Sequence, residues 1–463
     1  MTVADNQTTR EHFAARSPAT DGHLSKVVTV YIFCVVVPIY FYVGPLYLNT
    51  LRTLLLILLA PLAIKLVTGK CGRVILTDGL FFAYFLWTIP ALMVNNPDAV
   101  IQQTGSTGAE FLGGYLVGRV YIRNRHQFLA MCRQLAMVVL ILLPFGLIEA
   151  RNSNPVIPDL IRRLPSVFSV PDVNIPGRMG LNRVQNSFNH PIHYGLFSSV
   201  VFSLNFIALQ GKINPVWRWV SSTLIGLGCF LALSSGALLA LLLQLGLIAW
   251  AVVFQKITWR WWLLLGCGVV AYIAIDLLSN RTPFKVFLSY ATFSPQTAYW
   301  RALIFEYGFQ NALDNPLFGI GLNDWERPSW MYGDSMDNFW LVVAVRYGFP
   351  AAIFIIAGYM RVLLKVIFLK IEDDPELSRI RRAWVFSFVG LTFTLVTVHI
   401  WSNIYSFVFF MFASGIWMLN AHPESSDTSS PETIDKEHPT KNRFTRFDHR
   451  QSQLSDVSAH GSK

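Results

Sequence analysis

The segment ALLALLLQLGLIAWAVVF, residues 237–254, contains eighteen residues and no charged side chain. An apolar α-helix of this length is about 27 Å long at ~1.5 Å per residue, close to the ~30 Å of a bilayer's hydrocarbon core. Similar runs recur along the chain, and 53% of its 463 residues are hydrophobic while 14% are charged. The sequence therefore predicts an all-α polytopic membrane protein.

Reading each apolar run of roughly 17–25 residues as a helix predicts about twelve transmembrane helices within a membrane domain at 27–420. The expected helices lie at 27–46, 50–67, 75–94, 106–122, 127–148, 191–209, 216–233, 237–254, 259–278, 338–359, 383–400 and 403–419. The fourth run is the least regular, because it contains Glu110 and four glycines.

Lysine and arginine gather in alternate connecting segments, which orients the helices because basic residues accumulate on the cytoplasmic side. The residues that set this orientation are Lys65, Lys70, Arg73, Arg119, Arg123, Arg125, Arg133, Lys212, Arg218, Lys256, Arg260, Arg361, Lys365, Lys370, Arg379, Arg381 and Arg382. We therefore expect an inner-membrane protein with both termini in the cytoplasm. Its net charge of +10 then reflects cytoplasmic loops rather than nucleic-acid binding.

The two ends of the chain are polar. Residues 1–26 lack the pattern of a cleavable signal peptide, so the first helix should stay attached to a cytoplasmic N-terminal tail. Residues 421–463 are rich in Ser, Thr, Asp, Glu, Lys and Pro, and have almost nothing apolar to bury. This composition predicts a disordered cytoplasmic C-terminal tail.

Two large periplasmic loops are expected at about 150–190 and 279–337. The first has five arginines and no lysine, although positive charge is normally depleted in segments outside the membrane. Arg178, Arg183, His190 and His193 should cluster where this loop enters the helix that begins at Pro191. Such a cluster indicates a site for an anionic ligand.

The second loop should contain an amphipathic helix at 298–313 with Arg301 in its first turns. The glycine-containing segment LFGIGLNDW follows at 317–325. Asp337 and Asn338 then stand at the start of the tenth predicted helix, where carboxylates are favoured by the helix dipole and can cap the N-terminus. The loop therefore brings further charged residues to the outer face.

No nucleotide or metal site is expected. The sequence contains neither a GxxxxGK[ST] phosphate loop nor a GxGxxG motif after a strand, which argues against a nucleotide-driven pump. No group of histidines and cysteines has the spacing of metal ligands, so we expect no metal and no cofactor.

Four motifs, taken in order, resemble the bacterial O-antigen ligase and Wzy-type polysaccharide polymerase superfamily over 27–419. They are NRVQNSFNHPIHYG at 182–195, LSSGALLALLLQ at 233–244, the Arg301 helix with NPLFGIGLNDW at 315–325, and DNFWLVVAVRYGFPAAI at 337–353. The resemblance implies a GT-C-like helical enzyme that transfers glycan from a polyprenyl-diphosphate carrier to an acceptor sugar at the periplasmic face, without a nucleotide sugar or a metal.

The reaction that the resemblance implies requires two kinds of group, and particular residues fit each of them. A diphosphate leaving group needs permanently charged donors, and guanidinium binds phosphate bidentately, so Arg183 and Arg301 are the first choices, with Arg178 in support. Family ligases typically have a histidine just before the asparagine that starts the late helix, but this chain has Asp337 before Asn338. Asp337 is the expected base for the acceptor hydroxyl, and its departure from the family pattern favours a polymerase over a ligase.

Alternatives accompany these assignments. A polymerase of exopolysaccharide, capsule or O-antigen repeat units is preferred, a ligase that transfers finished glycan is the first alternative, and a lipid-linked glycan flippase is the second. His190 and His193 compete with Asp337 as the base. His190, His193 and Asn338 are also candidate substrate-binding residues. A chain-length regulator protein is a possible partner.

Structural roles compete with each catalytic role. Arg301 could anchor its helix to lipid headgroups, Asp337 and His190 could be plain helix caps, and Arg183 could form an ion pair with Asp172. Arg346, deep in the tenth helix, is expected to pair with Glu110 or Asp276, because intramembrane charge normally has a partner. The small residues at 234–240 are assigned to close helix packing without a chemical role.

Overall fold

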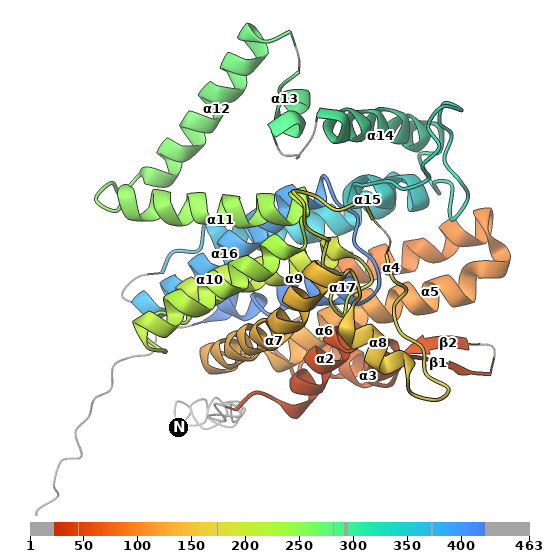
Figure 1. Ribbon diagram of the computed structural model, residues 1–463, viewed down its shortest axis with the longest axis horizontal. Coiled ribbons are helices and arrows are strands. Elements are labelled where there is room, and N and C mark those ends of the chain that lie inside the picture. The colour runs from red at the N-terminus through yellow and green to blue at the C-terminus, as the bar shows by residue number, and fades with distance from the viewer. Residues whose placement is uncertain are drawn as a thin grey trace, which may run out of the picture. The chain divides into compact units, whose positions relative to one another are not determined.

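The computed structural model describes residues 23–44, 46–173, 175–280, 282–290, 295–371 and 374–421. Of the tails expected at 1–26 and 421–463, residues 1–22 and 422–463 lie outside this part of the chain. The described elements form one compact unit (Figure 1). They are α2 (Lys26–Val36), β1 (Tyr40–Val43), β2 (Leu46–Asn49), α3 (Thr50–Val67), α4 (Leu76–Asn95), η1 (Pro97–Ala99), α5 (Val100–Gly108), η2 (Ala109–Gly113), α6 (Gly114–Tyr121), α7 (Arg125–Asn152), α8 (Val156–Arg162), α9 (Pro191–Ser203), η3 (Leu204–Ala208), α10 (Pro215–Leu231), α11 (Ser235–Val253), α12 (Arg260–Leu278), α13 (Pro283–Tyr290), α14 (Pro295–Asp314), α15 (Phe339–Ile367), α16 (Pro375–Leu395), α17 (Ser402–Ala413) and η4 (Ile416–Asn420).

The protein is mainly helical, and eight of its helical segments are long and apolar enough to cross a membrane. These segments are Thr50–Val67, Leu76–Asn95, Arg125–Asn152, Pro191–Ala208, Ser235–Val253, Arg260–Leu278, Phe339–Ile367 and Ser402–Asn420. Each coincides with an apolar run found in the sequence, so the prediction of a mainly helical, multi-pass membrane protein is confirmed for the described residues.

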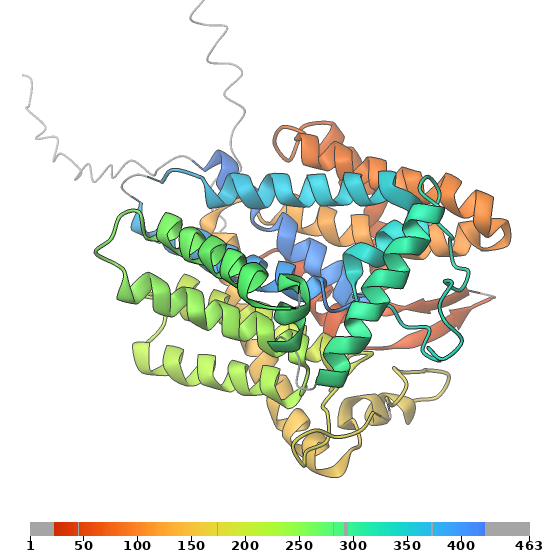
Figure 2. The same cartoon turned by 90° about the horizontal axis from the view of Figure 1, so that it is seen from above.

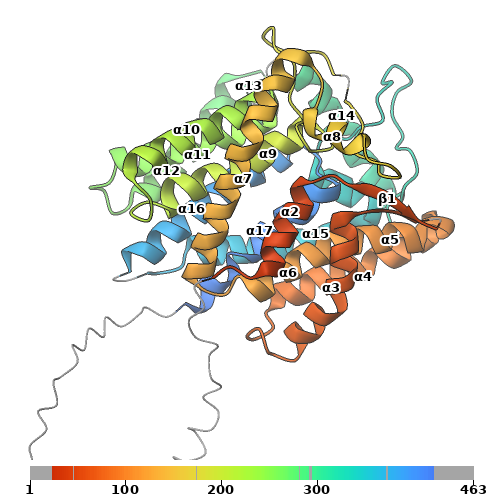
Figure 3. The same ribbon diagram turned by 60° about the horizontal axis from the view of Figure 1, so that its bottom comes forward.

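The first predicted helix, 27–46, is wrong in its second half. The helix α2 ends at Val36, where Val37 takes an extended conformation before Pro38. A residue before proline is pushed out of the helical region, which explains this end. The aromatic run that follows forms the antiparallel hairpin β1–β2, and Tyr40 pairs with Phe168 of the first loop. Figure 3 displays this hairpin beside α2.

The irregular fourth run is one nearly continuous helix with a defect. It consists of α5, a single π-helical turn η2 and α6, and Glu110 lies inside the π-turn. A π-turn inserts one extra residue into a helix and often occurs at functional sites. The irregularity seen in the sequence therefore has a structural counterpart.

The small residues at 234–240 lie where α11 packs against its neighbours. A Cβ atom on Gly195 of α9 would come within 2.6 Å of Ala237, and one on Gly390 of α16 would come within 2.7 Å of the Ala240 carbonyl oxygen. Such close approaches between helix backbones require residues without bulk. Beyond α11, the chain leaves the bundle in α12, where no residue is buried, and returns through α14, which packs across the start of α15 (Figures 1 and 2).

The helix α15 is broken in its middle. Gly348 has φ +80° and ψ 173°, which interrupts the helical ladder before Pro350. The glycine segment after α14 fills the break, because the amides of Ile320 and Gly321 donate to the carbonyls of Val345 and Arg346 at 2.8 and 2.9 Å. Non-helical backbone at membrane depth needs such internal partners.

Candidate functional site

A cavity of about 860 Å³ opens at one end of the bundle, between the two long loops and the N-terminal ends of α9, α11 and α15. Five of the seven candidate site residues line it. The lining residues are Arg178, Arg183, His190, Ile192, Ser234, Ser235, Thr297, Arg301, Ile320, Leu322, Asn323, Asp324, Trp325, Asp334, Ser335, Met336, Asp337, Val342, Val345, Arg346, His399 and Trp401.

The two arginines of the first loop are fixed to the corner between α10 and α11. Nη1 of Arg178 donates to the carbonyl of Leu233 at 2.9 Å, and Nε of Arg183 donates to the carbonyl of Ala232 at 3.4 Å. Arg183 thus does not pair with Asp172, which instead binds Arg162 at 2.7 Å. The alternative of an Arg183–Asp172 ion pair is wrong.

Arg301 reaches the same corner from the second loop. Its Nη1 lies 3.5 Å from Oγ of Ser235, the first residue of α11. Only 9% of Arg301 is exposed, and its Nε is buried without a hydrogen-bond partner among the described residues. Buried donors of this kind are rare unless a ligand or ion completes them. Burial of this depth also distinguishes Arg301 from an arginine that extends to lipid headgroups.

The electrostatics of the cavity follow from burial of like charges. Burial, with a smaller contribution from the neighbouring charge of Arg178, lowers the pKa of Arg183 to about 10, while Asp337 opposes the shift. Burial also lowers the pKa of Arg301, with Asp337 acting in the opposite direction. Guanidinium groups crowded in this way gain most from an anionic ligand, because it relieves both desolvation and mutual repulsion.

Asp337 and Asn338, either of which could cap the following helix by sequence, have different roles in the structure. The side chain of Asn338 caps α15 by accepting the amide N–H of Leu341 at 3.1 Å. Asp337 is therefore not the helix cap. Burial raises the pKa of its carboxyl group, although Arg301 and Arg183 both act to lower it. A carboxylate with a raised pKa is suited to accept a proton near neutral pH.

The two candidate histidines, His190 at the N-cap of α9 and His193 within α9, differ in position. His190 caps α9, since its Nδ1 accepts the amide N–H of Ile192 at 3.1 Å, and its ring lines the cavity. Burial and the charge of Arg183 lower the pKa of His190 to about 4, so the ring is neutral. His193 is 1% exposed, lies 4.1 Å from Trp401 between ring centroids, and does not line the cavity.

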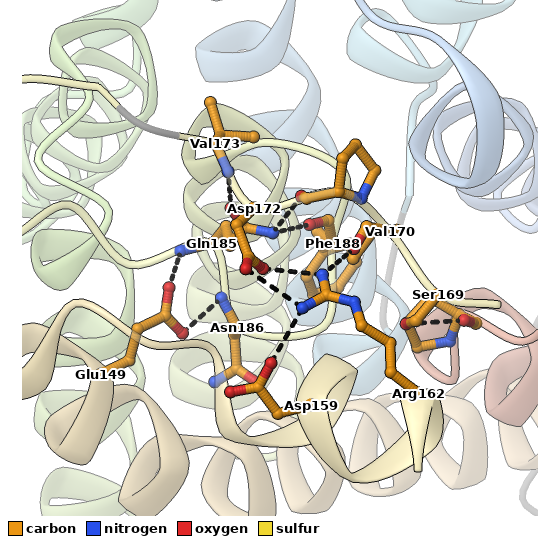
Figure 4. Close-up of polar contacts among 12 residues, drawn as sticks. Glu149, Asp159, Arg162, Ser169, Val170, Asp172, Val173, Gln185, Asn186 and Phe188 are labelled. Carbon is orange, nitrogen blue, oxygen red and sulfur yellow. Dashed lines mark hydrogen bonds and ion pairs between the residues drawn. The ribbon is translucent and has the colours of Figure 1, made fainter. Parts of the chain in front are cut away.

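The buried carboxylate of Glu149 fixes the loop segment that contains Arg183. The two oxygens of Glu149 accept the amide N–H groups of Gln185 at 2.7 Å and Asn186 at 2.9 Å (Figure 4). Asn186 has φ +55°, an uncommon conformation that this clamp supports. The side chain of Gln185 then binds the amide of Val173, which ties the two halves of the loop together.

The predicted ion pair of Arg346 with Glu110 or Asp276 is wrong. Glu110 pairs with Arg52 at 2.7 Å, and Asp276 lies on α12, outside the packed bundle. Arg346 instead lines the floor of the cavity, together with His399. Its position two residues before Gly348, where α15 is broken, places its charge beside the ligand space rather than in a structural ion pair.

Sequence reasoning missed several cavity residues. Ser234 and Ser235 were assigned to packing alone, but they line the cavity where three arginines converge. His399 and Trp401 lie between α16 and α17 in a segment that was expected to be helix or a short turn. The departure from apolar character at HIWSN, residues 399–403, was the available signal.

The comparisons with known proteins identify the central part of the chain. Residues 220–356 match the model of the O-antigen ligase family, a range that contains Ser234, Arg301, Asp337 and Gly348. No curated protein matches the chain. Arg178, Arg183 and His190 lie outside the matched range and reach the cavity through the preceding loop. The match over residues 220–356 supports the resemblance of this chain to the O-antigen ligase and Wzy superfamily.

Proposed function

We propose that this protein is a glycosyltransferase that polymerises polyprenyl-diphosphate-linked repeat units of exopolysaccharide, capsule or O-antigen at the periplasmic face of the bacterial inner membrane. The supporting observation is the buried Nε of Arg301, which lacks a partner among the described residues in a cavity shared with Arg178 and Arg183. The donors match a diphosphate in charge and in bidentate geometry.

In the proposed reaction, the acceptor hydroxyl oxygen bonds to C1 of the donor sugar while the bond between C1 and the phosphate oxygen breaks. The bonding electrons leave with the diphosphate, and Arg183, Arg301 and Arg178 stabilise the charge that develops on it. The hydroxyl proton passes to the carboxylate of Asp337. The N-terminus of α11 at Ser235 adds a partial positive charge at the same place.

His190, His193 and Asn338 take supporting roles in this proposal. His190 is neutral and fixes the entry of α9, while His193 supports Trp401 from behind the cavity wall. Asn338 caps α15 and so frees the Asp337 carboxylate. No metal or cofactor takes part, since the arginines supply the positive charge.

The proposed membrane arrangement is GT-C-like with twelve spans and both termini in the cytoplasm. Adding α2, the α5–η2–α6 helix, α10 and α16 to the eight apolar helical segments gives twelve. The cavity then faces the periplasm, where lipid-linked glycans and a chain-length regulator protein would meet the enzyme. Asp337 in place of the family histidine favours a polymerase over a ligase, and charges grouped at one end of the bundle favour an enzyme over a flippase.

Deletion of the gene, followed by glycan analysis and complementation with Arg301→Ala, tests the function. A polymerase predicts accumulation of single repeat units on the lipid carrier, both in the deletion strain and in the Arg301→Ala strain. Free long lipid-linked chains would indicate a ligase instead. Repeat units retained on the inner leaflet would indicate a flippase.

A further inference from the structure

A second, smaller cavity of about 160 Å³ lies directly beside the large one. The two share a partition made of Val342, Arg346, His399 and Trp401. Val342 and Arg346 lie on the same face of α15 because they are four residues apart, and Asp337, just before this helix, lines the large cavity with them. The partition therefore begins close to the proposed base.

On the side away from the large cavity, the small cavity is lined by a buried ion pair, one member of which lies in a π-helical turn. Nε of Arg52 donates to Oε1 of Glu110 at 2.7 Å, and Glu110 belongs to the π-turn η2. Among the described residues, the two terminal nitrogens of Arg52 make no hydrogen bond, which leaves them available to a ligand. Gln103, Ser106 and Thr107, on the turns before Glu110, add neutral polar groups.

The chemistry of this wall fits a neutral ring with several hydroxyl groups. A paired carboxylate and guanidinium offer an acceptor and donors side by side, which matches the two faces of a vicinal diol. Trp401, 37% exposed at the partition, provides an apolar face for the C–H side of a sugar.

We propose that the cavity between Arg52, Glu110 and Trp401 binds the terminal sugar of the acceptor glycan and presents its hydroxyl across the partition toward Asp337. This inference rests on the proposed glycosyl transfer. His399 lines both cavities, and burial lowers its pKa to about 3, so it stands at the partition as a neutral hydrogen-bonding group. Its Nδ1 is buried without a partner among the described residues.

The volumes of the two cavities also fit ligands of different size. Water occupies about 30 Å³ per molecule in the liquid, so 160 Å³ corresponds to about five waters, the scale of one sugar ring. The large cavity, at about 860 Å³, has room for a diphosphate and several sugars. A single terminal sugar in the small cavity and a longer donor in the large one accounts for both sizes.

The test uses the full chain purified in lipid nanodiscs. Thr107→Phe fills the small cavity, and Gln103→Leu removes a polar group from its wall without adding bulk. Ile101→Phe is the control, because Ile101 on the same helix is 90% exposed and does not line the cavity. Substitution of Arg52 or Glu110 is avoided, since a broken buried pair destabilises the fold whatever its function.

Two readouts distinguish acceptor from donor. A lipid-linked repeat unit, extracted from a strain that lacks the gene, serves as donor and acceptor in a chain-growth assay, and glycan-free polyprenyl diphosphate reports the large cavity alone. We expect Thr107→Phe and Gln103→Leu to raise the KM for repeat units at least about tenfold and to leave the Kd for polyprenyl diphosphate within about twofold of wild type. Ile101→Phe should change neither value.

An unchanged KM in both cavity variants, or a Kd that rises together with the KM, would overturn the acceptor site and leave the proposed function standing. If Thr107→Phe does not purify as a monodisperse protein, Gln103→Leu alone decides by the same criterion. Failure of the proposed function has a different signature, because the wild-type protein would then neither extend repeat units nor bind polyprenyl diphosphate.

Discussion

Nε of Arg183 donates to the carbonyl of Ala232 at 3.4 Å, so an arginine of the first loop is fixed to the corner where α10 meets α11. Arg301, from the second loop, reaches Ser235 at the start of α11. Two segments more than a hundred residues apart in sequence thus deliver guanidinium groups to one corner of the bundle.

Asp337→Asn is expected to separate catalysis from binding. Loss of a general base typically lowers a rate by about 10²–10⁴-fold, so the kcat for chain growth should fall by that order. Binding of polyprenyl diphosphate should be retained, because the substitution removes a negative charge from the diphosphate site. Steady-state kinetics and a binding assay on the same preparation measure both. A variant with wild-type kcat would show that Asp337 is not the base.

The same substitution should stabilise the fold at neutral pH. Burial raises the pKa of Asp337 in the folded protein above its unfolded value. The protonated form is therefore favoured by folding, and the stability it contributes is present below the unfolded pKa and lost as pH rises through the folded pKa. Asn mimics the protonated form, so the Tm of Asp337→Asn should exceed that of wild type at pH 7 and match it more closely in acid. A lower Tm at pH 7 would contradict this account.

The pH dependence of activity should have an acid limb set by Asp337. The base must be ionised, so activity falls as pH drops through a pKa above the ordinary ~3.9 of aspartate. Arg183→Gln removes a positive charge that lowers the pKa of Asp337 and should move the acid limb to higher pH. The measurement is the pH profile of kcat in the two proteins. An acid limb that stays in place would separate Arg183 from Asp337.

The sequence was sufficient to predict the helix that contains Arg301, expected at 298–313 and found in α14, because its periodicity and its flanking prolines are local signals. The sequence also predicted that Arg178, Arg183 and Arg301 lie on the same side of the protein. It could not decide whether Asp337 or Asn338 caps α15, since both residue types are good caps and only the fold orients them.

Other errors arose from tertiary contacts that no local pattern records. The expected pairing of Arg346 with Glu110 failed because Arg52, at the start of α3, is the partner of that carboxylate. The roles of Ser234 and Ser235 were missed because small residues at a helix start indicate packing equally well. The first predicted helix was too long because hydrophobicity alone does not distinguish a helix from the aromatic hairpin after Pro38.

Gly348→Ala tests the break in α15. The residue has φ +80°, and a Cβ atom there would lie 2.0 Å from the carbonyl oxygen of Leu317. Strain of this kind costs about 1–3 kcal/mol before the clash is counted, so the Tm should fall and the glycine segment after α14 should be displaced. Gly246→Ala is the matched control, because that glycine of α11 has no atom within 4 Å of the added Cβ. Equal effects of the two substitutions would contradict the role of the break.

Glu149→Ala tests the clamp on the first loop. The substitution leaves the amides of Gln185 and Asn186 buried without an acceptor, at a cost of about 1–3 kcal/mol for each unsatisfied group. The segment that carries Arg183 should loosen, and the Kd for polyprenyl diphosphate should rise although Glu149 does not line the cavity. Glu149→Gln, which keeps one acceptor, should recover part of the affinity. A lower Tm with unchanged Kd would limit Glu149 to a structural role.

The affinity of the purified protein for glycan-free polyprenyl diphosphate tests the central claim most directly. Arg301→Ala and Arg183→Ala should each raise the Kd at least about tenfold, which corresponds to about 1.4 kcal/mol. Arg163→Ala serves as the control, because this arginine of the first loop is exposed and does not line the cavity. A wild-type Kd in both cavity variants, or an equal loss in all three, would contradict the convergence of guanidinium groups on a lipid-borne diphosphate.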